Sequence, residues 1–225
     1  MLQREEGQAL VEAAFVLPAI VFLLLVALQL TQLQQARILA DHAAFAAARA
    51  GIVMNGDPGK MRDAAVLAVL SGVGPTDSAA AMVKTLVRFK AEEIALGPLG
   101  LDQLRVHVHN PVARDFPAWG QHLHGEEIDF DDVRPGATDA TLLSLQIRWL
   151  YELRVPFANR LLQTIWIAAH RASSAAALSV DDGMPQGLSL GALVAAAGAG
   201  RYYLPLQAFY TMRMQSNPYR KWAHP

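Results

Sequence analysis

The chain has 225 residues, of which 53% are apolar and 17% are charged, with a formal net charge of -1 and a mean hydropathy of +0.22. The near-neutral charge argues against a general nucleic-acid binder, and the absence of cysteine excludes disulfides, thiol nucleophiles and cysteine metal sites. This length suits one folded domain with its own core, and the apolar excess in the first 50 residues indicates a membrane anchor as well.

The first predicted element is a helix long enough to cross a membrane. Residues 9–30 contain only two polar residues, Glu12 and Gln29, and residues 13–28 are all apolar. At about 1.5 Å per residue this segment covers roughly 33 Å, more than a bilayer core requires. Pro18 lies inside it, where membrane helices tolerate proline better than soluble helices do. A buried glutamate costs about 2–3 kcal/mol, so Glu12 either reaches the headgroups or awaits a positive partner in the membrane.

A cleavable secretory signal is the alternative interpretation of this segment, because small residues such as Ala40 and Ala43 follow the apolar run. Against it, the leading residues MLQREEG carry one arginine and two glutamates, and the apolar run is longer than a usual signal core. The charges that flank the span do not decide its orientation. The short N-terminus and the large remainder favour an arrangement with the N-terminus inside and the C-terminal part outside the cytoplasm.

The residues around the span also resemble a known motif. The run GQALVEAAFVLPAIVFLLLVALQ, from Gly7 to Gln29, is similar to the N-terminus of TadE-like pseudopilins of tight-adherence (Tad) pilus systems, which use type IVb (Flp) pilins. The resemblance covers roughly residues 6–51. Ala13 stands where the major Flp-type pilins carry tyrosine, and the chain is much longer than those pilins. Both differences argue for a minor pilin or pseudopilin.

The resemblance implies how the N-terminus is processed and used. In that family a prepilin peptidase cuts after the glycine, so Gly7 and Gln8 flank the implied cleavage site and Glu12 becomes the fifth mature residue. Glycine takes the extended backbone of a peptidase site at the lowest cost. The new α-amine of Gln8 is a positive group with which Glu12 of a neighbouring subunit can pair, which offsets the cost of burying that carboxylate. Pro18 is the expected bend in this helix.

The same helix is predicted to continue beyond the bilayer through residues 31–50, which contain no helix breaker. Small apolar residues recur there at helical spacing, which predicts a stripe that packs closely on the chain's own domain or on partner helices. Gly51 is expected to end the helix. The stripe consists of Leu33, Ala36, Ala40, Ala43, Ala44 and Ala47.

Two shorter helices are predicted next, at about residues 58–70 and 78–95. Asp57 followed by Pro58 is a favourable helix start. Asp77 is expected to be the N-cap of the second helix, and a GPLG sequence closes it.

Three later segments alternate apolar and polar residues, which predicts half-buried strands. The longest covers residues 143–155, and the others cover residues 103–109 and 204–215. Strands that follow helices favour an α+β fold, in which an antiparallel sheet of about three strands packs on the long N-terminal helix, with additional helices. Residues 159–169 are predicted to form a helix, either in the core or at the membrane surface. Residues 181–200 are left unassigned.

One cluster of polar residues suggests metal binding. His107 and His109 share a face of a predicted strand, and two strand histidines with a loop carboxylate can hold one metal ion. The alternative is a polar sheet face beside a solvated acidic loop, and no known metal-ligand spacing is present. No nucleophile elbow, phosphate loop or dinucleotide fingerprint is present either, so no catalytic residue is predicted. The cluster also includes residues of the acidic loop that follows the strand, namely His122, His124, Glu126, Glu127, Asp129, Asp131 and Asp132.

The sequence predicts a transmembrane and extended N-terminal helix (8–51) and an extracytoplasmic α+β domain (52–225), and the resemblance implies a prepilin leader (1–7). The resemblance implies a non-enzymatic minor pilin or pseudopilin that contributes to pilus assembly or adhesion in a Tad secretion system. Its implied partners are prepilin peptidase, other pilin or pseudopilin subunits and the inner membrane, which it crosses once with a periplasmic C-terminal domain. No cofactor and no nucleic acid is expected. The alternatives are a bitopic protein with a ligand- or partner-binding domain, and a metal-dependent periplasmic enzyme.

Overall fold

The structure is a computed structural model that describes residues 2–123, 125–176 and 188–223. These residues form two compact units, and each unit is described by itself. The first unit comprises residues 2–34, 152–176 and 190–204, and the second comprises residues 35–123, 125–151, 188–189 and 205–223.

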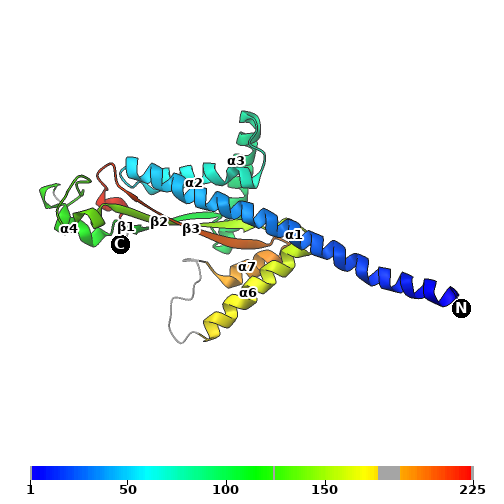
Figure 1. Cartoon of the computed structure of the whole chain (residues 1–225). Coiled ribbons are helices and arrows are strands. Elements are labelled where there is room, and N and C mark those ends of the chain that lie inside the picture. The colour runs from blue at the N-terminus through cyan, green and yellow to red at the C-terminus, as the bar shows by residue number, and fades with distance from the viewer. Residues whose placement is uncertain (1, 124, 177–187, 224–225) are drawn as a thin grey trace. The chain divides into compact units, whose positions relative to one another are not determined.

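Helix α1 (Leu2–Val53) is the longest element, about 78 Å at about 1.5 Å per residue (Figure 1). It continues two residues past Gly51, which was expected to end it. The glycine instead permits close packing, because a Cβ there would lie 2.6 Å from Met61 Sδ and 2.7 Å from Leu143 Cδ2. The predicted stripe is confirmed, with Leu33 half-buried and the alanines fully buried. Its most buried members, none more than 2% exposed, are Ala36, Ala40, Ala43, Ala44 and Ala47, joined by Ala48 and Ile52.

Two helices follow α1, as predicted. Helix α2 (Pro58–Val73) is capped by Asp57, whose Oδ1 accepts a hydrogen bond from Gly59 N at 2.8 Å. Helix α3 (Ala79–Leu96) is capped by Ser78, whose Oγ accepts from Ala81 N at 3.2 Å. The prediction of Asp77 as the cap is therefore wrong. A cap oxygen reaches the amides two or three residues further on, and the helix begins one residue too late for Asp77 to do so.

Three strands form one antiparallel sheet in the order β1-β2-β3, which confirms the α+β class. They are β1 (Leu104–Asn110), β2 (Leu142–Glu152) and β3 (Tyr203–Arg213). In the second unit the apolar face of the sheet packs on α1 and α2 (Figure 1). At Gly72 of α2, for example, a Cβ would lie 2.7 Å from Cη2 of Trp149.

The connection between β1 and β2 contains short helices that were not predicted, including α4 (Phe116–Trp119) and α5 (Ala137–Ala140). Phe116 and Ile128 are fully buried and form a small core there. The backbone of the C-terminal segment closes this region, because Arg220 N donates to Glu126 O at 2.8 Å.

The first unit contains helix α6 (Ala158–Ala176), which confirms the helix predicted at residues 159–169. It also contains α7 (Leu190–Gly198), which lies in the unassigned segment. Residues 181–187 of that segment lie outside the described residues. An ion pair between Arg201 Nε and Glu152 Oε1, at 3.1 Å, links the chain after α7 to the end of β2.

Candidate functional site

The N-terminal part of α1 presents an apolar surface on which no described part of the chain packs. All side chains from Val11 to Leu24 are exposed, and Phe15 and Leu23 are 76% and 67% exposed. Exposed apolar surface of this extent marks a membrane or partner-helix contact. Within the described part of the chain, α1 is the one helix long and apolar enough to cross a membrane. The structure thus contains an N-terminal helix suited to a single membrane pass.

The predicted processing and pairing residues all lie on α1. Gly7 and Gln8 lie in its first turns, and the Gln8 side chain is outside the described residues. Glu12 is exposed and lies one helical turn further on. Pro18 lies inside the helix, where it supplies no N–H to the carbonyl of residue 14. Cleavage at Gly7, pairing by Glu12 and a bend at Pro18 stay predictions.

A polar contact that sequence reasoning missed joins α1 to the chain after β2. Gln29 is fully buried, and its Oε1 accepts a hydrogen bond from Val155 N at 2.8 Å. Both residues belong to the first unit. The only sequence signal was a glutamine at the end of an apolar run. This hydrogen bond fixes Val155, which lies just before α6, beside the C-terminal end of the apolar segment of α1.

Replacing Gln29 with leucine is expected to lower the free energy of unfolding by about 1–3 kcal/mol, because the buried Val155 amide loses its acceptor. Unfolding of the full chain in detergent, followed by circular dichroism, measures this change. The matched control is Gln32→Leu, since Oε1 of Gln32 is buried without a hydrogen-bond partner in the described part of the chain. Equal stability of the two variants would show that the contact with Val155 contributes nothing.

The predicted metal pair lies together on β1. The His107 and His109 rings have centroids 4.6 Å apart, and His109 Nε2 lies 3.2 Å from Gln146 Oε1. The described residues contain no group of three or more histidine and carboxylate side chains placed to hold one metal ion. The side chains of His122 and His124 lie outside the described residues. Metal binding by the His107–His109 pair stays a prediction.

Two carboxylates of the acidic loop bind groups within the same loop. Asp129 Oδ1 accepts a hydrogen bond from Asp131 N at 3.1 Å, and Asp132 pairs with Arg134. Arg134 Nε donates this hydrogen bond to the Asp132 carboxylate, and the bond together with the negative charge of Asp132 raises the pKa of the Arg134 guanidinium. These contacts stabilise the turn itself, as expected for a solvated acidic loop.

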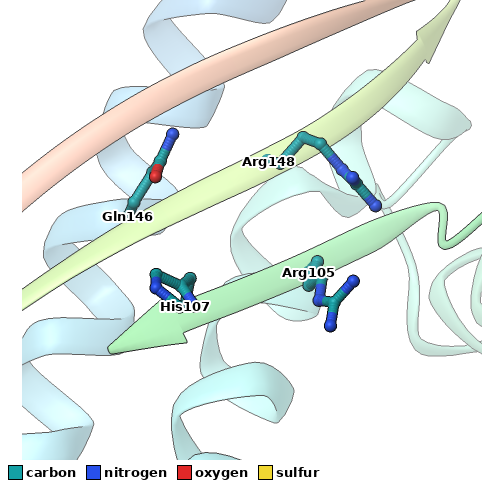
Figure 2. Close-up of a pocket in the computed structure, with 4 residues that line it drawn as sticks. All are labelled: Arg105, His107, Gln146 and Arg148. Carbon is teal, nitrogen blue, oxygen red and sulfur yellow. The ribbon is translucent and has the colours of Figure 1, made fainter. Parts of the chain in front are cut away.

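A basic pocket on the polar face of the sheet was not predicted. Figure 2 shows Arg105 and His107 on β1 beside Gln146 and Arg148 on β2, and these four residues line a cavity of about 10 Å³. Arg105 lies directly opposite Arg148 in the strand register. Burial lowers the pKa of the Arg148 guanidinium, Asp102 opposes this, and Arg105 adds to the lowering. The pocket has room for about one water molecule, which is too little space for a substrate.

Comparison with known proteins identifies the N-terminal segment. Residues 7–49 match a family model described as TadE: TadE-like protein. No curated protein and no solved structure matches the chain. The matched residues begin at the predicted cleavage glycine, include the exposed apolar surface and end in the buried alanine stripe. The part of the chain that carries the predicted processing and assembly residues is therefore similar to the TadE-like family.

Proposed function

We propose that this protein is a minor pilin or pseudopilin of a Tad-type pilus and secretion apparatus, anchored in the inner membrane by α1. The observation that carries the proposal is the TadE-like match over residues 7–49, on a helix with two different surfaces. Its first part is exposed and apolar, and its second part is buried in the second unit through small side chains. One continuous helix therefore connects a membrane and subunit contact to a folded domain.

The proposal includes cleavage by prepilin peptidase between Gly7 and Gln8 and an extracytoplasmic position for the second unit. The helix argues against cleavage by an ordinary signal peptidase after Ala40. Such a cut would remove Ala36 and Ala40, which are at most 2% exposed, from the packed face of α1. It would also remove Gln29, the acceptor for Val155 N. A cut after Gly7 leaves all of these contacts in place.

In this proposal other pilin or pseudopilin subunits contact the exposed part of α1, and photo-crosslinking tests that contact. A photoreactive amino acid placed at Phe15, which is 76% exposed, is expected to crosslink to pilin-type subunits in cells that carry the apparatus. The matched control is Val87 on α3, which is 63% exposed outside the span. Crosslinks from Phe15 to lipid alone would contradict assembly through this helix and favour a plain bitopic protein.

A further inference from the structure

Helix α6 carries an apolar stripe that is exposed to solvent. Leu161 and Ile165 lie one turn apart on the helix and are 38% and 55% exposed, and Phe157, the residue just before the helix begins, is 72% exposed. The backbone of Phe157 has a φ of 65°, a left-handed conformation that bulky residues rarely adopt. A strained residue that holds a large apolar side chain in water points to a contact that this chain alone does not supply.

The stripe begins close to Gln29, the residue at which the apolar segment of α1 ends. The hydrogen bond from Val155 N to Gln29 Oε1 places residue 155 beside the end of that segment, within the first unit. Phe157 follows two residues later. If α1 crosses a bilayer, the start of α6 therefore lies at the level of the lipid headgroups.

The charge of α6 matches an anionic surface. Between Leu153 and Val180 the sequence has three arginines and no acidic residue. Arg160 and Arg171 are exposed and eleven residues apart, so at about 100° per residue they lie on the same side of the helix, beside the apolar stripe. An apolar stripe flanked by arginine is typical of helices that lie in a membrane interface.

A cavity of about 550 Å³ lies between α6 and α7 on the arginine side of the stripe. Arg160, Gln163 and Arg171 line it from α6, and Val194 and Ala197 line it from α7. Gln163 is only 1% exposed, and its Nε2 has no hydrogen-bond partner in the described part of the chain. The cavity thus combines two cationic side chains, one unsatisfied buried donor and an apolar wall. Phosphate oxygens suit the donors, and an acyl chain suits the wall.

We infer that the α6–α7 cavity binds the phosphate headgroup of an anionic phospholipid, while the stripe from Phe157 to Ile165 lies in the same leaflet. The first unit then has two membrane contacts, a spanning helix and an interfacial helix. This inference requires that α1 crosses the bilayer, but it does not depend on peptidase processing or on assembly into a pilus.

The position of the stripe is tested by fluorescence quenching in lipid nanodiscs. Because the chain has no cysteine, Ile165→Cys in the full-length protein takes a single environment-sensitive label. Leu23→Cys, in the span, is the membrane control, and Val87→Cys on α3 is the aqueous control, with native exposures of 67% and 63%. Brominated lipid is expected to quench the label at position 165 nearly as strongly as at 23. Quenching as weak as at position 87 would overturn the inference.

The headgroup site is tested by native mass spectrometry of lipid retention. The wild-type chain is expected to retain phosphatidylglycerol in preference to phosphatidylcholine, and the double variant R160Q/R171Q is expected to bind it at least about tenfold more weakly. The variant R160K/R171K keeps the charge and is expected to retain most of the binding. Arg88→Gln on α3, whose side chain is 54% exposed, is the matched control and is expected to bind like the wild type.

Two outcomes would overturn the headgroup assignment. The first is equal retention of the two lipids, or retention unchanged in R160Q/R171Q. The second is competition by millimolar inorganic phosphate that removes the bound lipid, because the cavity would then be a site for free phosphate. Circular dichroism of each variant confirms that a loss of lipid binding is not a loss of folding. A failure of processing at Gly7 would leave both tests unaffected, so the inference and the proposed function can fail separately.

Discussion

A chain with Glu12→Ala is expected to insert in the membrane at least as well as the wild type, but to be lost from the assembled pilus apparatus. Removing a carboxylate from the span lowers the cost of insertion by about 2–3 kcal/mol. Under the proposed function it also removes the partner of the Gln8 α-amine on a neighbouring subunit. Fractionation of cells that carry the apparatus, with detection of the chain in the membrane and in sheared filaments or purified assemblies, measures both effects.

Glu12→Gln separates charge from size in this experiment. The glutamine keeps the shape of the side chain but not its charge, so it is expected to fail in assembly as Glu12→Ala does. Glu12→Asp keeps the charge on a shorter side chain and is expected to retain part of the assembly. If Glu12→Ala assembles like the wild type, the pairing role is wrong and the bitopic alternative is favoured.

Trp149→Ala is expected to lower the free energy of unfolding by about 3–5 kcal/mol. The Trp149 side chain is 1% exposed, lies against Gly72 and packs edge-on to the ring of Tyr151 at 5.4 Å. Its removal leaves a cavity between α2 and the sheet. Chemical denaturation of the full chain in detergent measures the loss.

The matched variant for this site is Trp149→Phe. Nε1 of Trp149 is buried without a hydrogen-bond partner in the described part of the chain, so phenylalanine loses packing but removes an unsatisfied donor. Its cost is therefore expected to be well below that of Trp149→Ala. A Trp149→Ala protein within about 1 kcal/mol of the wild type would show that the helices do not pack on the sheet as described.

The elements that could be predicted from the sequence are those with a long periodic pattern. The apolar face of β2, the alanine stripe of α1 and the helix at α6 all repeat over several turns or residue pairs. A periodic pattern predicts which side chains are buried, however, and not which backbone groups form hydrogen bonds. The alternation runs to Val155, which is buried, but β2 ends at Glu152, and Val155 N donates to the side chain of Gln29 and not to a neighbouring strand.

The parts that could not be predicted depend on contacts between residues far apart in the sequence. Alternation placed Arg148 on the polar face, but only the register shows that it lies opposite Arg105 and is 3% exposed. The role of Gln29 likewise depends on a residue 126 positions later. Helix α7 lies in a segment rich in glycine, alanine and leucine, whose composition favours no period. Gly7 and Glu12 could be singled out only through their resemblance to a family motif.

The N-terminus of the protein isolated from its native membrane tests the central claim most directly. If α1 is a processed TadE-like assembly helix, N-terminal sequencing or intact mass gives a chain that begins at Gln8 and lacks residues 1–7. The same chain from cells without prepilin peptidase keeps those residues. A chain that retains Met1 in the presence of the peptidase, or one that begins after Ala40, would contradict the account.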